Sequence, residues 1–155
     1  MLLHVLALSI GIVAGLRAMM APAAASWAAS LGALSLGGTW LAFLGYTWTP
    51  WIVTVLALGE LITDQLPTTP SRKVPAQFGA RILNGGLAGA AIGFAGDNWV
   101  IGGVLGVLGA VLGTLGGSAV RARLAAAFGR DLPAALIEDV VAIAAAVLIV
   151  LALLP

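Results

Sequence analysis

Long apolar stretches alternate along the chain with short polar segments that carry most of its charge. Strongly apolar stretches cover 2–20, 50–66, 78–96, 99–120 and 134–154, and a weaker, alanine-rich stretch covers 23–46. A helix needs about 20 apolar residues to cross the hydrocarbon core of a bilayer. Each strong stretch is long enough, or nearly so, to be one span. The pattern therefore predicts an all-α fold, a polytopic transmembrane helical bundle.

The stretch 23–46 is ambiguous, because its hydropathy is weak and Gly37 and Gly38 interrupt it. It fits a span, a re-entrant segment or an interfacial helix. As a span it gives six crossings and places all seven basic residues on one side of the membrane, whereas five crossings leave Arg17 on the other side. Basic loops favour the cytoplasm, so we prefer six. Aromatic residues then mark the outer side: Tyr46, Trp48, Trp51 and Trp99.

Six spans divide into two groups of three. We take residues 1–155 as a single transmembrane domain with halves 1–66 and 78–155. An odd number of spans in each half makes the second half start on the opposite side of the membrane. This is the topology of the inverted repeats found in transporters. A three-plus-three inverted repeat is thus a hypothesis that rests on the span count.

Composition narrows the classes of protein further. Of 155 residues, 61% are hydrophobic and 8% are charged, with a net charge of +1, whereas soluble domains carry roughly 25% charged residues. This predicts a multi-pass protein of the bacterial inner membrane, surrounded by lipid and without a nucleic-acid partner. The chain has no cysteine and a single histidine, His4, which excludes thiol catalysis, Cys-ligated metals and multi-His sites. We expect no cofactor.

Charged residues inside the apolar stretches form the most informative pattern. Two acidic pairs stand near span ends, and three arginines stand at a similar depth in other spans. An ionised side chain within the bilayer costs several kcal/mol unless it is paired or faces water. The sequence therefore predicts one buried polar cluster on the cytoplasmic side. Its members are Glu60, Asp64, Glu138, Asp139, Arg17, Arg81 and Arg121.

Three functions fit such a cluster. The first, which we favour, is a small transporter or channel in which these seven residues bind an ion or small polar solute, with Glu60 as the proton carrier. The second is a membrane-embedded enzyme that acts on a phosphorylated lipid, since carboxylates hold Mg²⁺ and arginines bind phosphate. No known metal motif is present, so a metal is left open and enzyme activity is disfavoured. The third is a structural or assembly protein whose salt bridges fix helix positions.

Two further features bear on partners. Arg72 and Lys73 lie in the basic loop and are candidates for binding anionic lipid head groups, although such a loop is also the ordinary topogenic signal. Glycines recur at helical spacing in the fifth stretch, at Gly102, Gly106, Gly109, Gly113 and Gly117. Such spacing permits close helix packing, within one chain or between copies. A single copy has little room for a transport pathway, so we expect a homodimer.

Three motifs carry a resemblance to a known family. They are Gly15-Leu16-Arg17 followed by Pro22; Glu60-x3-Asp64-x2-Pro67-x2-Pro70-Ser71-Arg72 followed by Ala80-Arg81; and Arg121 followed by Ile137-Glu138-Asp139-x2-Ala142. Together they resemble a family of small bacterial membrane proteins known as domain of unknown function 4126, over nearly the whole chain. The resemblance implies that these positions are the polar residues of the family. It implies no activity, substrate or cofactor.

Overall fold

The computed structural model describes residues 1–65 and 71–154, and these two ranges hold helices and no strand. The helices are α1 (Leu2–Leu16), α2 (Met20–Ser30), the 3-10 helix η1 (Ala42–Gly45), α3 (Thr49–Thr63), α4 (Pro75–Phe94), α5 (Trp99–Phe128) and α6 (Asp131–Leu153). The all-α prediction is confirmed for the described residues. Two helices, α5 and α6, are long and apolar enough to cross a membrane, and α1 and α3 are apolar but shorter.

The stretch 23–46 is not one continuous helix, and a crossing of the membrane by this stretch stays a prediction. α2 has 11 residues, which makes it roughly 16 Å long at about 1.5 Å per residue. Residues 31–48 then pass through turns and η1. Gly32 and Gly38 adopt φ of 82° and 78°, a conformation that glycine takes without the steric cost of a Cβ. These glycines end the helical path that the alanine-rich composition favours.

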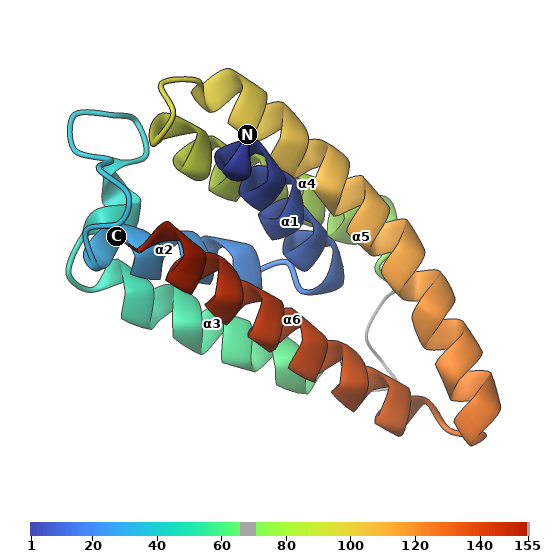
Figure 1. Cartoon of the computed structure of the whole chain (residues 1–155). Coiled ribbons are helices and arrows are strands. Elements are labelled where there is room, and N and C mark those ends of the chain that lie inside the picture. The colour runs from blue at the N-terminus through green and yellow to red at the C-terminus, as the bar shows by residue number, and fades with distance from the viewer. Residues whose placement is uncertain (66–70, 155) are drawn as a thin grey trace.

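A tight group of α1, α4 and α5 forms one side of the molecule (Figure 1). Gly11 lies against Gly106, and further along both helices Gly15 lies against Ala110, so α1 and α5 run parallel. α4 runs antiparallel to them, with Gly89 against the backbone of α5. A Cβ at Gly106 would overlap the backbone of α4. The glycine stripe therefore packs helices within one chain, where small residues permit close backbone approach.

α2, α3 and α6 lie beside this group and complete the fold (Figure 1). α1, from the first half of the sequence, thus packs with α4 and α5 from the second, and α6 packs against α5, α1 and α2. The halves 1–66 and 78–155 interlock, and their helices differ in length. α4 is antiparallel to α1, as an inverted repeat requires; the repeat itself stays a prediction.

The two ends of the molecule differ in chemistry. At one end, which we call the aromatic end, Trp40 and Trp99 pack edge to face with ring centroids 5.7 Å apart, and Phe94 stacks on Trp99. At the other, the charged end, α1 and α3 finish and α4 and α6 begin. Arg17 and Asp64 meet there. The separation of aromatic from charged residues expected from the sequence is present in the fold.

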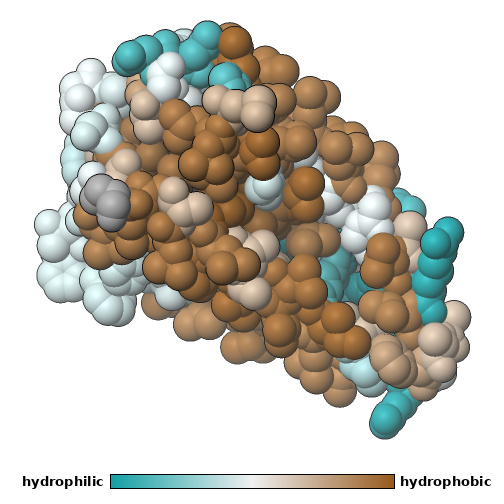
Figure 2. Space-filling view, in the orientation of Figure 1, coloured by the Kyte–Doolittle hydropathy of each residue, from teal (hydrophilic) through white to brown (hydrophobic). Residues whose placement is uncertain are grey.

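Large apolar side chains cover the outside, and alanines make up much of the interior beside a smaller set of buried Ile, Leu and Val side chains. Val140 and Leu148 of α6 are 66% and 65% exposed, whereas Ala14, Ala88 and Ala110 are fully buried. Figure 2 shows the resulting surface, hydrophobic along the helices and hydrophilic at the lower right end and along the upper edge. Soluble monomers rarely expose continuous apolar patches of this kind.

Candidate functional site

A break between α1 and α2 lies at the charged end. α1 ends at Leu16, and Arg17 is extended, with φ −140° and ψ 110°. Its N–H still donates to Val13 O at 2.8 Å, and α2 begins three residues later. Each broken helix end exposes backbone groups that need partners. Side chains from distant helices supply those partners.

Glu60 of α3 binds the beginning of α2. Its Oε1 accepts a hydrogen bond from the Ala18 amide and its Oε2 accepts one from the Met19 amide, each at 2.7 Å. An anion at a helix N-terminus is favoured by the free N–H groups and by the helix dipole. Pro22, in the first turn of α2, has no N–H to satisfy. Glu60 is therefore a fixed cap in this conformation and not a free carboxyl.

Arg81 of α4 binds the end of α1. Its Nη1 donates to Gly15 O at 3.1 Å and to Leu16 O at 2.9 Å. The side chain is 1% exposed, and its Nη2 lies 3.7 Å from Glu60 Oε1 and 3.4 Å from Asp64 Oδ2. Thr114 Oγ1 also donates to Gly15 O, at 3.4 Å. One guanidinium thus links the carbonyl end of α1 to the two carboxylates of α3.

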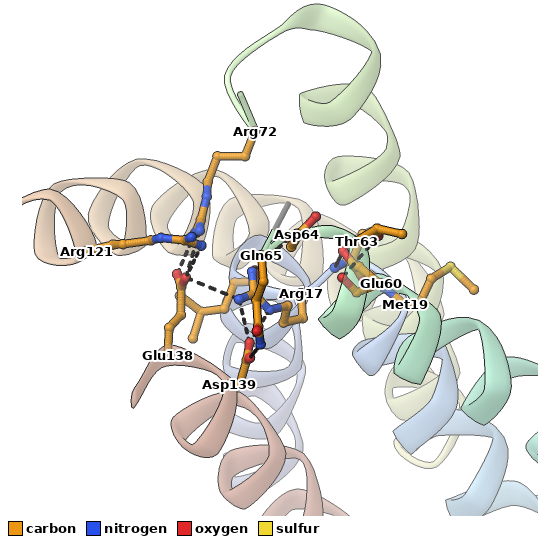
Figure 3. Close-up of polar contacts among 12 residues, drawn as sticks. Arg17, Met19, Glu60, Thr63, Asp64, Gln65, Arg72, Arg121, Glu138 and Asp139 are labelled. Atoms are coloured by element: carbon orange, nitrogen blue, oxygen red, sulfur yellow. Dashed lines mark hydrogen bonds and ion pairs between the residues drawn. The ribbon is translucent and has the colours of Figure 1, made fainter. Parts of the chain in front are cut away.

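Arg17, in the break itself, joins α3 to α6. Its Nη1 donates to Asp64 Oδ2 at 2.8 Å, and its Nε donates to Asp139 Oδ1 at 2.6 Å. The side chain is completely buried. Gln65 donates to the second oxygen of Asp139 at 3.0 Å. Figure 3 shows Arg17 between the acidic residues of the two helices.

Three arginines lie around Glu138 of α6. Arg72 binds it through both guanidinium ends, at 2.5 Å and 2.7 Å, and Arg121 Nη1 lies 3.4 Å from its Oε2 (Figure 3). Arg17 Nη2 is 3.7 Å away. Arg121 also holds Asp131, at the start of α6, through two hydrogen bonds of 2.5 Å and 3.0 Å. Such bidentate pairs are the strongest of the charge-assisted hydrogen bonds.

We call this assembly the charged network. It consists of Arg17, Arg72, Arg81, Arg121, Glu60, Asp64, Asp131, Glu138 and Asp139. Four positive and five negative charges leave a net charge of −1 when all are ionised. Every carboxylate in it has a hydrogen-bond partner. Within the described residues, the buried side-chain atoms that lack one are donors, Arg17 Nη2 and Arg81 Nε, although Arg17 Nη2 lies 2.5 Å from Asp139.

All seven residues predicted from the sequence belong to this network. Sequence reasoning missed two members, Arg72 and Asp131, and also Gln65, which binds Asp139 beside the network. Arg72 is named above as a lipid-binding candidate; in the structure its guanidinium is held by Glu138 and its side chain is 9% exposed, and lipid binding stays a prediction. Lys73 is exposed, and its ammonium group pairs with no carboxylate among the described residues. The sequence did offer a signal for Arg72 and Asp131: both are charged residues in segments expected on the same side of the membrane as the predicted cluster.

The arrangement does not resemble a metal centre. No group of three or more His, Asp or Glu side chains in the described ranges is placed to hold a metal ion. The carboxylates face arginines and backbone amides. His4 lies at the opposite end, beside Gly96 and Asn98.

Comparison of the chain with protein-family models, with curated proteins and with solved structures finds no match. The resemblance to domain of unknown function 4126, drawn from the three sequence motifs, therefore stays a prediction.

Proposed function

We propose that this chain is a multi-pass protein of the bacterial inner membrane that crosses the bilayer six times. α5 and α6 are long enough for this by themselves. The direction of the chain supports four more crossings: α1, α3 and α5 run toward the charged end, and α2, α4 and α6 run away from it (Figure 1). α2 is too short to span alone, so residues 31–48 complete its path.

The distance along α5 agrees with this placement. Arg121 follows Trp99 by 22 positions, which is roughly 33 Å of helix at about 1.5 Å per residue. The hydrocarbon core is about 30 Å thick. With the aromatic end at the outer interface, where tryptophan is enriched, the outermost arginine of the network reaches the inner interface. The deeper members then lie in the cytoplasmic half of the membrane.

On this basis we propose that the protein transports an ion or a small polar solute. The observation that carries the proposal is the break between α1 and α2 inside the charged network. The chain reverses direction there, since α1 runs toward the charged end and α2 away from it, and non-helical backbone at membrane depth is tolerated where it is buried in protein or lines a cavity. Ionisable side chains inside a membrane bundle commonly mark ion and proton pathways. Here both helix ends at the break are bound by charged side chains from other helices, Glu60 and Arg81. Motion of those helices would open the break.

The alternative functions fit the geometry less well. A lipid-phosphate enzyme needs arginines free to bind phosphate, yet Arg17, Arg72 and Arg121 are paired with carboxylates. It also needs a cation site, and the described residues offer none. A purely structural network explains the pairing. The flux measurement described below distinguishes this structural role from transport.

Flux through reconstituted protein tests the proposal. Purified wild-type protein and Glu60→Gln are placed in liposomes, and the movement of Na⁺, K⁺, H⁺ and small anions is measured against protein-free liposomes. We expect flux above the protein-free level in the wild type and a loss of coupling in Glu60→Gln. Asp97→Asn, an acid-to-amide change at the aromatic end, is the matched control and should behave as wild type. Equal flux in wild-type and protein-free liposomes for every solute would disprove transport.

The predicted homodimer remains part of the proposal, because one chain offers few helices to enclose a pathway. The mass of the protein in detergent solution should correspond to two chains. Sedimentation in a solvent whose density matches the detergent measures this mass. A single-chain mass would remove the dimer and leave the site within one copy unaffected.

A further inference from the structure

A groove opens on the outside of the molecule between its two longest helices. α5 and α6 meet at the turn around Gly129 and separate from each other away from it (Figure 1). The space between them is a cavity of about 320 Å³, and side chains of α1 line it as well. Figure 2 shows pale and hydrophilic residues in this gap, within an otherwise hydrophobic face. We call this cavity the α5–α6 groove.

One glycine in the wall of the groove is not explained by packing within the chain. A Cβ at Gly113 would overlap the backbone of Ile12, so the approach of α1 requires glycine there. Gly116, one turn further along α5, also lines the groove, but open space lies around the position that its Cβ would take. Glycine is the weakest helix former after proline. The chain thus leaves space at Gly116 that its own helices do not use.

The lining of the groove changes from apolar to charged along its length. Leu112 of α5 and Val141 of α6 line the part that lies away from the turn, and Arg121 and Glu138 line the part nearer to it. Pockets with mostly apolar walls and a few polar groups bind ligands whose orientation those polar groups fix. This groove therefore suits an amphipathic ligand with its polar group at the charged end.

The length of the groove matches one leaflet of a bilayer. Its lining on α5 runs from Leu112 to Leu124, which is roughly 18 Å at about 1.5 Å per residue. Arg121, at the inner interface in the proposed placement, follows Leu112 by roughly 14 Å on the same scale. Half of the hydrocarbon core is about 15 Å. The groove thus extends from the inner interface to near the middle of the membrane.

The width of the groove distinguishes a hydrocarbon chain from a helix. A volume of about 320 Å³ over that length gives a mean cross-section of roughly 18 Å². Carbon atoms in contact lie about 4 Å apart, so an extended acyl chain of about that thickness fits. A helix is about 10 Å across and fills roughly 80 Å², so it cannot enter the groove.

The unpaired charges at the charged end are positive. Arg130 lies in the turn that joins the two walls of the groove, and Lys73 and Arg123 are exposed at the same end. These three cations form no ion pair within the described residues, whereas Asp131, the exposed acidic residue next to Arg130, is held by Arg121. Exposed Lys and Arg residues attract anionic lipid head groups. An anionic head group at this end would meet cations that no carboxylate has neutralised.

We infer that the α5–α6 groove binds one acyl chain of an anionic phospholipid from the cytoplasmic leaflet, with the phosphate of that lipid beside Arg130. This inference rests on the membrane placement proposed above and not on transport. Because Arg121 and Glu138 line the groove, the bound lipid lies against the charged network. It should therefore stabilise the folded protein.

Retention of lipid by the purified protein tests the inference. Wild-type protein in detergent is incubated with equal amounts of phosphatidylglycerol and phosphatidylcholine and washed, and the lipid that stays bound is counted by native mass spectrometry. We expect one lipid per chain and a preference for phosphatidylglycerol of about fivefold, the effect of one basic residue near a membrane surface. Phosphatidylglycerol should also raise the melting temperature by mass action.

Two variants, each with a matched control, probe the two ends of the lipid. Gly116→Leu fills the groove without a clash and should retain on the order of tenfold less lipid, because several CH₂ groups lose their place. Gly59→Leu, at an exposed position of α3 that also has open space, should retain as much as wild type. Arg130→Gln should lose the preference for phosphatidylglycerol, and Arg123→Gln should keep it.

Three results would overturn the inference. They are equal retention by Gly116→Leu and Gly59→Leu, no preference between the two lipids in the wild type, and loss of the two-chain mass in Gly116→Leu with its lipid retained. The third result would place a second copy of the chain at the groove. If Gly116→Leu does not fold, the lipid preference of wild type and Arg130→Gln still decides.

The flux assay separates failure of this inference from failure of transport. Solute flux together with equal lipid retention in all variants leaves the transporter and removes the lipid site. Lipid retention that is lost in Gly116→Leu, without flux of any solute, leaves the lipid site and removes the transporter. Release of the protein from cell membranes by alkaline carbonate would remove the membrane placement, and the lipid site with it.

Discussion

Replacement of Arg17 by glutamine is the sharpest test of the charged network. The Arg17 guanidinium is completely buried and binds Asp64 through Nη1 and Asp139 through Nε and Nη2. Glutamine is too short to reach both, and it offers one amide group in place of five N–H donors. Two carboxylates, about 12% and 8% exposed, then lose their main positive partner.

The expected loss follows from those contacts. Removal of one partner from a buried ion pair costs about 3–5 kcal/mol, because the remaining charge is left uncompensated. Asp64 keeps Arg81 at 3.4 Å and Asp139 keeps Gln65 at 3.0 Å, which places the expected value at the lower end, about 3 kcal/mol. Since every 1.4 kcal/mol is a factor of ten, the folding equilibrium shifts on the order of 100-fold.

The assay is equilibrium unfolding of the purified protein by titration with a denaturing detergent, followed by tryptophan fluorescence. Arg123→Gln removes an exposed arginine from the same end and should leave the transition unchanged. Arg17→Gln combined with Asp139→Asn removes the stranded charge as well, so it should recover part of the loss. The reasoning about the network is refuted if Arg17→Gln unfolds at the same detergent concentration as Arg123→Gln. It is also refuted if the double variant is less stable than Arg17→Gln alone.

Three further predictions concern packing, topology and pairing. Gly106→Ala should destabilise the protein by about 1–3 kcal/mol through overpacking, since its Cβ would overlap the backbone of α4. Gly116→Ala, with open space around it, should be neutral or gain up to about 1 kcal/mol of helix propensity. Equal melting temperatures of the two variants would contradict the packing scheme. In the natural cysteine-free background, Thr47→Cys should react with an impermeant thiol reagent applied to intact cells and Ser71→Cys should not, and the reverse pattern would place the charged end outside. Arg72→Gln should lower the melting temperature because it strips both guanidinium contacts from Glu138, while Lys73→Gln should not, and similar melting curves would show that the Arg72 pair contributes nothing.

The helical class of the fold and the grouping of its charges followed from the sequence. Five apolar stretches predicted helices where α1, α3, α4, α5 and α6 lie. The cost of charge in an apolar environment predicted that Glu60, Asp64, Glu138 and Asp139 would meet arginines, and they do. The length of the apolar stretches and the cost of burying a charge both depend on hydropathy alone. Hydropathy belongs to each residue by itself, so both arguments can be made without knowing which residues become neighbours in the fold.

The partners that hold the turn at Arg17 were not predictable in the same way. The apolar stretches 2–20 and 23–46 imply a turn close to Arg17, but nothing local shows which side chains bind the two helix ends. The break is held by Glu60 and Arg81, which lie more than 40 residues away along the chain. The same holds for residues 23–46, whose alanine content favours helix while Gly32 and Gly38 turn the chain.

By itself, then, the sequence determined that the chain is helical, that its outside is apolar and that most of its charged residues collect at one end. The tertiary structure alone decided which carboxylate binds which arginine, that Glu60 caps α2, and that Arg72 turns inward to Glu138. The physical reason is range. Burial energy is summed residue by residue, but a hydrogen bond between Arg17 and Asp139 joins groups 122 positions apart and depends on distances of a few ångströms that only the packed helices fix.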